Sequence, residues 1–393
     1  MSVDSISESP ILSLIDQIFR MRQDGQSVLG LHIGEPDFDT PAGIRDAAYR
    51  AMNEGFTHYV SAQGMPDLRA AIAARLRAKN RVPVSDEDIV VMSAKFAIYA
   101  TLLATIDPGD EVLLPDPTYL FEQPIQLTGG RPVYVPLRPD FSLDADALNA
   151  AVTPRSRLLF LVSPANPTGR VLREHEVRAA VEIARDRHLT IVSDETYESL
   201  VYEGTHVSPG SVATAEVPVI TIGSFSKLYA MTGWRAGFAA APPEIRTRLV
   251  KVIEHTFTCV PPFIQKACVW ALEHAGPDEA RFRNEFRARR DHLLGRLSKV
   301  EGLSTVRPGG AFYVFPHYEL ELPSVEFCSR LLAEERLALV PGVAFGPHGE
   351  RHVRISYSSP IDALDAGVDR LERFLAHASA LGSPASVGAA RPF

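Results

Sequence analysis

The residues with the clearest chemical potential follow an apolar run that ends at Ile222. Gly223-Ser224-Phe225-Ser226-Lys227 comes directly after this run, and Arg235 lies eight positions beyond the lysine. A lysine amine can react with a carbonyl group, and hydroxyls together with a guanidinium can bind a phosphate. The segment therefore indicates a site for a carbonyl cofactor that carries a phosphate. For the lysine taken alone, a solvated surface residue is the commoner interpretation.

Two further apolar runs also end in polar residues. Ser163 to Gly169, which includes Asn166, follows the run that ends at Val162, and Ser193 to Tyr197 follows the run that ends at Val192. A turn and a helix cap remain open as interpretations of each segment by itself. Because ligands bind outside the carboxyl ends of the strands in an open parallel sheet, the three segments together predict one crevice.

The elements that must position these residues alternate along the chain. Helical patterns take turns with short apolar runs between about residue 43 and the 270s, and the runs are Ile89–Met92, Glu111–Leu114, Leu158–Val162, Leu189–Val192 and Val217–Ile222. Such runs are typical of a mostly parallel sheet that helices cover on both faces, so we expect an α/β fold. After Pro277, a long charged helix at about 279–299 and short strands at 312–315 and 353–356 indicate a smaller α+β domain.

The length of 393 residues favours more than one domain. We expect an N-terminal arm at 1–42 that joins the small domain, a large cofactor-binding domain at 43–277, a small domain at 278–380 and a disordered tail at 381–393. Within the arm, Pro10 begins a helix with one apolar face that ends near Gly25; its apolar residues are Ile11, Leu14, Ile15, Ile18 and Phe19.

Composition narrows the class of protein. A net charge of −8 without a basic cluster argues against a nucleic-acid partner. We find no signal peptide and no long apolar run, so we predict a cytoplasmic protein with no membrane partner. The cysteines lack metal-ligand spacing, and we therefore expect neither a disulfide framework nor a metal site; they are Cys259, Cys268 and Cys328.

The order and spacing of the motifs resemble the class I aminotransferases of the aspartate-aminotransferase superfamily, which are fold-type I pyridoxal-phosphate enzymes. The similarity is strongest to the bacterial aspartate-aminotransferase-like branch and spans nearly the whole chain. Besides the three segments after the apolar runs, it rests on Gly34-Glu35-Pro36-Asp37-Phe38, Gly64 to Arg69, Asp107 to Val112, Pro308 to Tyr313 and Val353 to Ser356.

The resemblance implies roles for the residues around the cofactor ring. Lys227 would hold pyridoxal 5'-phosphate as an aldimine and later act as the base, while Asp194 would pair with the pyridine nitrogen. Asn166 and Tyr197 would donate to the phenolate oxygen, and Tyr119 would stack on the ring. These assignments make Lys227, Asp194 and Tyr197 the predicted catalytic residues.

The resemblance also implies a phosphate site. Arg235 and Ser224 would bind the phosphate with help from Ser226 and from the backbone amides of Ser93, Ala94 and Lys95 at a helix start. Related chains usually have glycine at the position of Ser93, which puts the geometry of that loop in question. Tyr59 would reach the cofactor phosphate of a second subunit, which implies a homodimer with shared active sites.

For the substrate, the resemblance implies that Arg354 grips the α-carboxylate in a fork, near the backbone of Gly34 and the side chain of Asn166. The resemblance also leads to the hypothesis that Lys95 neutralises the distal carboxylate of a dicarboxylic substrate such as 2-oxoglutarate; a contact with the cofactor phosphate and a solvent-facing side chain remain alternatives. An apolar pocket and a packed core remain alternative locations for three aromatic residues, which are Phe38, Phe121 and Phe263.

The resemblance implies an aminotransferase that moves an amino group from an L-amino acid to a 2-oxo acid. One alternative is a lyase or another α-carbon reaction on the same scaffold, because the same lysine, aspartate and arginine serve those reactions too. A second alternative is a non-catalytic sensor domain of a transcriptional regulator. The roughly thirty residues before Gly34 are too few for a DNA-binding module, which argues against that alternative.

Overall fold

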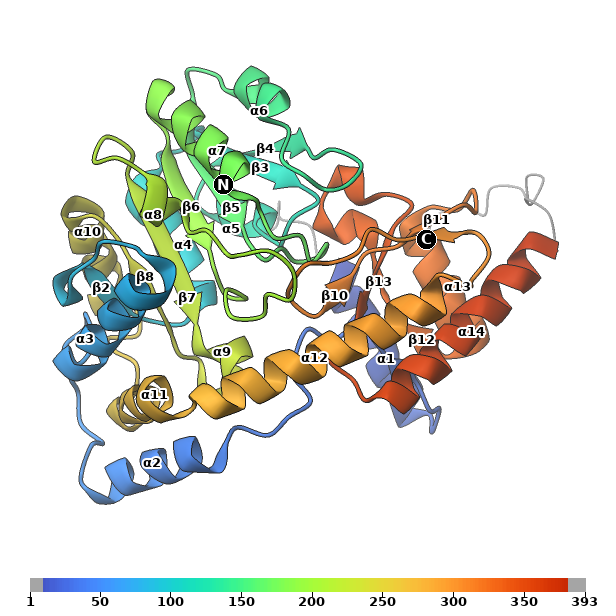
Figure 1. Cartoon of the computed structure of the whole chain (residues 1–393), viewed down its shortest axis with the longest axis horizontal. Coiled ribbons are helices and arrows are strands. Elements are labelled where there is room, and N and C mark those ends of the chain that lie inside the picture. The colour runs from blue at the N-terminus through green and yellow to red at the C-terminus, as the bar shows by residue number, and fades with distance from the viewer. Residues whose placement is uncertain (1–9, 381–393) are drawn as a thin grey trace.

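The computed structural model describes residues 10–380 and contains a seven-stranded sheet (Figure 1). Its strands, in spatial order, are β2 (Ile89–Val91), β8 (Gly237–Ala240), β7 (Val219–Ser224), β6 (Thr190–Asp194), β5 (Ser156–Val162), β3 (Glu111–Asp116) and β4 (Arg131–Pro136). Only β8 runs antiparallel to its neighbours. The predicted mostly parallel α/β sheet is therefore confirmed.

Helices cover both faces of this sheet (Figure 1). In β3, Val112 and Leu114 pack into the cluster that contains α4, whereas Leu113 packs into the cluster that contains α7. Successive residues of a strand point to opposite faces, so burial on both faces produces the unbroken apolar runs of the sequence. The helices of this part are α2 (Ala42–Asn53), α3 (Pro66–Arg75), α4 (Ala94–Thr105), α5 (Glu122–Leu127), α6 (Ala145–Ala151), α7 (Glu174–Asp186), α8 (Pro209–Val212), α9 (Phe225–Leu228), α10 (Pro243–Glu254) and α11 (Pro262–His274).

Two strands of the sheet, β4 and β8, were not predicted. Pro132 interrupts the apolar run of β4, and β8 consists of Gly237 to Ala240, which contains one large apolar side chain. A strand with glycine and alanine has a weak local signal, since β-branched and aromatic residues carry most of the strand preference. The position of β8 between β2 and β7 is set by the packing of the whole sheet.

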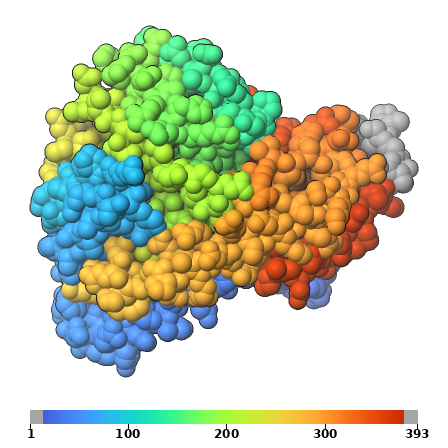
Figure 2. All heavy atoms as spheres, viewed as in Figure 1, coloured from blue at the N-terminus to red at the C-terminus, as the bar shows by residue number. Residues whose placement is uncertain are grey.

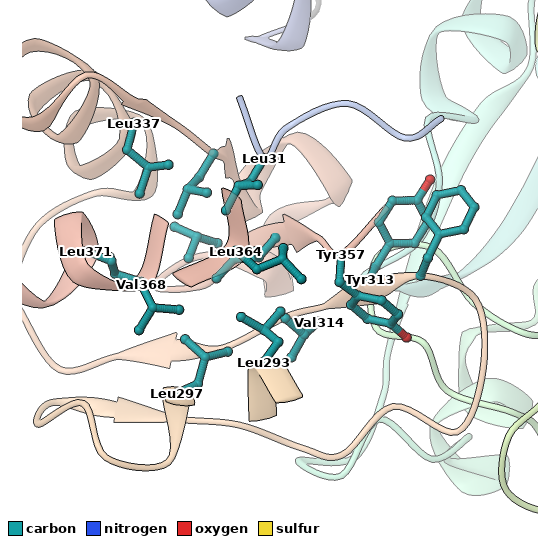
Figure 3. Packing of buried hydrophobic residues seen from close by; sticks show 14 of the residues in the cluster. Leu31, Leu293, Leu297, Tyr313, Val314, Leu337, Tyr357, Leu364, Val368 and Leu371 are labelled. Atoms are coloured by element: carbon teal, nitrogen blue, oxygen red, sulfur yellow. The ribbon is translucent and has the colours of Figure 1, made fainter. Parts of the chain in front are cut away.

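The C-terminal elements build a second core. The helix α12 (Gly276–Leu297), predicted at about 279–299, follows α11 in the chain and packs against α14 (Ile361–Ala380). Leu293, Val314, Leu364 and Val368 meet in a buried cluster there (Figure 3). The strands and the remaining helix of this part are β9 (Leu303–Ser304), β10 (Tyr313–Val314), β11 (His317–Tyr318), β12 (Leu337–Ala338), β13 (Val340–Pro341), β14 (Val353–Ser356) and α13 (Ser324–Glu335).

The N-terminal segment packs against these C-terminal elements. The strand β1 (Leu29–Gly30) pairs in parallel with β12. In the helix α1 (Pro10–Gln23), Leu14 and Ile18 are buried, but Ile15 and Phe19 are 43% and 61% exposed. The predicted helix is present, and only the side of it that carries Leu14 and Ile18 packs against the C-terminal elements.

In the space-filling view, the blue to yellow-green surface of the first part of the chain adjoins the orange and red C-terminal part, and α12 spans the two (Figure 2). The domain boundaries at 42 and 277 stay a prediction. The predicted tail at 381–393 lies outside the described residues. Within residues 10–380, no helix has the length and apolar character needed to span a membrane.

Candidate active site

A cavity of about 330 Å³ opens at the carboxyl ends of β5, β6 and β7. The three polar segments predicted to converge there do so. Twelve of the fourteen predicted site residues line it, and they are Gly34, Ala94, Lys95, Tyr119, Asn166, Asp194, Tyr197, Ser224, Ser226, Lys227, Arg235 and Arg354.

Ser93 and Tyr59 do not line this cavity. Ser93 caps α4, where its Oγ accepts a hydrogen bond from the Phe96 backbone N–H at 3.4 Å. Its φ of −67° and ψ of 143° are ordinary for an L-residue, so serine fits this loop without the freedom of glycine. The side chain of Tyr59 is 86% exposed and has no role in the cavity of its own chain.

Lys227 lies on α9, directly after β7, with its amine inside the cavity. Its Nζ donates a hydrogen bond to the Gly34 backbone oxygen at 2.6 Å. Burial, together with the positive charges of Arg235 and Arg354, lowers the pKa of Lys227 to about 8, although Glu35 opposes the shift. Because the neutral form of an amine is the nucleophile and the base, this pKa suits both roles near neutral pH.

Asp194 ends β6 in a buried position. Its Oδ1 accepts hydrogen bonds from the Thr196 backbone N–H at 3.1 Å and from the Thr196 hydroxyl at 2.6 Å. Burial raises the pKa of Asp194, while the hydrogen bonds and the nearby Lys95 act in the opposite direction. A buried carboxylate of this kind gains most from a positively charged partner inside the cavity.

Arg354 enters the same cavity from β14, in the C-terminal part of the chain. Its Nη1 donates to Asn166 Oδ1 at 3.0 Å, and its Nη2 donates to the His32 backbone oxygen at 2.6 Å. The Arg354 side chain lies over the rings of Tyr313 and Phe345, at 4.6 and 4.9 Å. Its buried Nε has no hydrogen-bond partner, so the guanidinium has capacity for an anion such as a carboxylate.

A second anion-binding group faces the cavity at the start of α4. Helix-start N–H groups have no partner within their helix, and Ala94 and Lys95 provide two of them here. Arg235 and Ser224 line the same cavity. Gly237 keeps the space beside Ala94 open, because an added Cβ would lie 2.6 Å from the Gly223 oxygen and 3.0 Å from the Ala94 nitrogen.

Tyr313 is a functional candidate for which the sequence analysis gave no role. Its hydroxyl lies 2.7 Å from the Tyr197 hydroxyl, and burial raises the pKa of both phenols. A Cβ on Gly34 would stand 2.3 Å from the Tyr313 hydroxyl, so the approach of these two segments requires glycine. Its place in the Pro308 to Tyr313 motif was the available signal.

The apolar wall of the cavity consists of aliphatic residues, which are Ile15, Ile33, Ile98, Leu120 and Val162. Of the two locations considered for the three aromatic residues, the structure supports the core. Phe38 stacks on Phe282 with ring centroids 4.5 Å apart, Phe121 is fully buried, and Phe263 packs into the cluster around α3 and α11.

The donor set of this cavity fits a phosphorylated carbonyl cofactor such as pyridoxal 5'-phosphate. It combines a buried amine of lowered pKa on Lys227 with a buried carboxylate on Asp194. The helix start with Arg235 is suited to a phosphate, and the open capacity of Arg354 is suited to a substrate carboxylate.

Comparisons with known proteins agree with this geometry. Residues 26–371 match the family model "Aminotransferase class I and II". An aspartate aminotransferase of Pyrococcus abyssi is 39% identical over 382 residues, which cover 95% of this chain and 97% of the relative. An aromatic-amino-acid aminotransferase 2 of Thermococcus litoralis is 37% identical and covers 92% and 95%. The solved structure of an aspartate aminotransferase from Thermus thermophilus with maleate superposes with a TM-score of 0.91 at 35% identity, covering 95% of this chain and 99% of that one.

Proposed function

This chain belongs to the class I and II aminotransferase family and is an aminotransferase that moves an amino group from an amino acid to a 2-oxo acid; from that premise, we propose that the cavity around Lys227 is its active site and that it holds pyridoxal 5'-phosphate. One observation carries the proposal. Lys227, Asp194 and Arg354 lie on three separate elements and yet line one cavity of about 330 Å³.

When bound, pyridoxal phosphate supplies an electron-withdrawing ring that stabilises negative charge at the α-carbon of the substrate. Lys227 Nζ takes the proton from that α-carbon, and its lowered pKa favours the neutral amine that this step needs. Asp194 would pair with the ring nitrogen of the cofactor and keep it protonated. Asn166 and Tyr197 would donate hydrogen bonds to the ring oxygen, and Tyr313 orients Tyr197 through the contact between their hydroxyls.

The two anion-binding groups of the cavity have different tasks. Arg235, Ser224, Ser226 and the start of α4 would bind the cofactor phosphate. Arg354 would bind the α-carboxylate of the substrate. This contact would replace, or add to, the hydrogen bonds that Arg354 donates to Asn166 Oδ1 and the His32 backbone oxygen. A fork of this kind fixes both the position and the orientation of the carboxylate.

For the acceptor, we propose a dicarboxylic 2-oxo acid such as 2-oxoglutarate, with Lys95 as its second cationic contact. Lys95 Nζ lies 4.9 Å from the centre of the Tyr119 ring inside the cavity. Burial lowers the pKa of Lys95, while Asp194 opposes that shift. A partly desolvated ammonium of this kind gains by pairing with a carboxylate.

Amino acids with apolar or aromatic side chains are a second group of candidate donors. The aliphatic wall of Ile15, Ile33, Ile98 and Leu120 supports them. The relatives reported above include both an aspartate and an aromatic-amino-acid aminotransferase. Ile15 is an exposed residue of α1. The bulky side chain of a substrate can therefore pack against it without displacing core residues.

The deciding experiment is a screen of amino acids and 2-oxo acids with product analysis. Transamination forms a new amino acid in an amount equal to the donor consumed, whereas elimination releases ammonia. In the same assay, Lys95→Ala should weaken the use of 2-oxoglutarate much more than that of pyruvate, and the exposed Lys299→Ala should change neither. An equal loss with both acceptors, or no activity with 2-oxoglutarate, would show that Lys95 does not bind the second carboxylate of the substrate.

We also propose a homodimer with shared active sites, in which Tyr59 contacts the cofactor phosphate of the second copy. Tyr59, Tyr49 and Met52 are exposed by 86%, 65% and 41%, which is unusual for large side chains and favours a protein interface. Light scattering should report a dimer, and Tyr59→Phe should speed cofactor loss from it without changing the mass. A monomeric active enzyme would refute this arrangement.

A further inference from the structure

A second cavity, of about 860 Å³, shares no lining residue with the active site. Its walls come from four parts of the chain, at 79–81, 170–178, 203–212 and 307–309. They include the end of the π-helix η2 (Leu76–Asn80), the start of α7 and the loop before α8. None of these parts is used by the aminotransferase chemistry described above.

Basic side chains outnumber acidic ones in the wall of this cavity. Six lysine or arginine side chains line it against two carboxylates, although the whole chain has a net charge of −8. Most of the cations are already paired: Arg170 with Glu176 and Arg178 with Glu174, for example. Like them, Lys79 and Arg307 have carboxylate partners.

Arg81 and Arg173 are different, because neither has a carboxylate within ion-pair distance among residues 10–380. Both residues are exposed, and both line the cavity. The hydrogen bonds of Ser142 lower the pKa of the Asp140 carboxyl most, and Arg173 lies close enough to that carboxyl to lower its pKa further. Two guanidinium groups without an ion-pair partner in a concave surface raise the positive potential there, since the surrounding protein has a lower dielectric constant than water.

Buried polar atoms without partners provide a second, independent observation. Ten such side-chain atoms occur among the described residues, and three belong to lining residues of this cavity: Asn80 Oδ1, Arg170 Nε and His206 Nδ1. The active-site cavity has the same signature, in His32 and Arg354. Buried polar groups normally find partners, and five of the ten atoms belong to residues that line one of these two cavities, where a bound molecule can approach them.

His206 adds an imidazole to the wall. Its Nε2 lies 2.9 Å from the buried Glu195 Oε2. Burial acts to lower the pKa of His206, but Glu195 outweighs it, and the pKa is raised. When protonated, the imidazole has a second N–H at Nδ1, and this is the atom that lacks a partner.

We propose that this cavity binds a small polyanion whose charged groups are phosphates or carboxylates, with Arg81 and Arg173 as its main cationic contacts. Guanidinium groups bind both kinds of oxyanion in a bidentate manner, so these two arginines are suited to either source. The inference rests on this cavity alone and does not depend on the substrate of the active site.

The test is calorimetric titration of the holoenzyme, in which the cofactor already occupies its own phosphate site. Pyrophosphate and citrate are the two probes, and each is titrated first without and then with a saturating 2-oxo acid substrate. We expect one equivalent of probe to bind. Tighter binding of pyrophosphate identifies phosphate as the preferred group, and tighter binding of citrate identifies carboxylate.

The variant pair is Arg81→Asn with Arg173→Gln. Asparagine suits position 81, where φ is 58° and lies in the left-handed region. The double variant should weaken probe binding about 10-fold or more, since it removes two charge-assisted contacts. The matched control is Arg131→Gln, an exposed arginine at the start of β4 with no part in the cavity.

Circular dichroism of each variant establishes that it is folded. The proposal is refuted if neither probe binds at millimolar concentration, or if the double variant binds as tightly as the parent. An equal loss in Arg131→Gln would also refute it, because it would show a general effect of net charge. Binding that disappears when the 2-oxo acid is added would assign the probe to the active site and reject the second one.

Discussion

Replacing Arg354 with lysine keeps the positive charge but removes the planar fork. In the structure, Arg354 makes two hydrogen bonds at 2.6 and 3.0 Å and has a third, unused donor at Nε. A lysine ammonium is a point charge on a flexible stem and cannot donate two parallel hydrogen bonds to one carboxylate. The side chain is 5% exposed, so water does not compensate for the lost donor.

A hydrogen bond to a charged group contributes about 1.5–3 kcal/mol, and the loss of one of the two bonds of the fork therefore lowers kcat/KM about 10- to 150-fold. Because the amino acid and the 2-oxo acid both carry the α-carboxylate, KM should rise for both. Single-turnover kinetics of each half-reaction, measured over a range of substrate concentrations, gives the two KM values separately.

Arg290→Lys is the matched control. Arg290 is 1% exposed and donates to the Pro308 backbone oxygen at 2.8 Å, but it does not line the cavity. Its replacement should lower the thermal midpoint without changing either KM. The reasoning fails if Arg354→Lys leaves both KM values at those of the parent, or if Arg290→Lys raises them to the same extent.

Three other predictions concern the centre of the cavity. Lys227→Ala should abolish turnover, and borohydride treatment of the parent should attach the cofactor to Lys227; a labelled peptide with a different lysine would contradict the assignment. Asp194→Ala should retain bound cofactor but lose most of the proton-transfer rate, so near-normal turnover would exclude its role. The pKa of Lys227 is lowered to about 8, so the rate at which the apoprotein takes up cofactor should rise with pH and level off above about 8, as the neutral amine becomes dominant. Stopped-flow absorbance measures this profile. A rate that still rises toward pH 10 would mean that the pKa of this amine is not lowered.

Much of the fold was predictable because a strand that is buried on both faces of the sheet has an unbroken run of apolar residues in the sequence. β5, β6 and β7 were predicted within two residues of their observed bounds, as was the shift to a charged helix at α12. The strands β4 and β8 were not predicted, because they lack such an apolar run. Their sequences contain proline, glycine and alanine, and only their neighbours in the sheet hold them extended.

The amino-acid sequence by itself determined which residues stand at the strand ends and, through its motifs, the family; it also predicted Lys227 as the lysine that holds the cofactor. Only the tertiary structure brought Arg354 within 3.0 Å of Asn166, 188 residues earlier in the chain, and Tyr313 within 2.7 Å of Tyr197. It also assigned Phe38 to the core and Ile15 to the cavity, and it gathered Arg81 and Arg173 in one basic wall. The physical reason is that local patterns report the period and the burial of one element, whereas contacts between distant elements depend on how all of their faces pack at once.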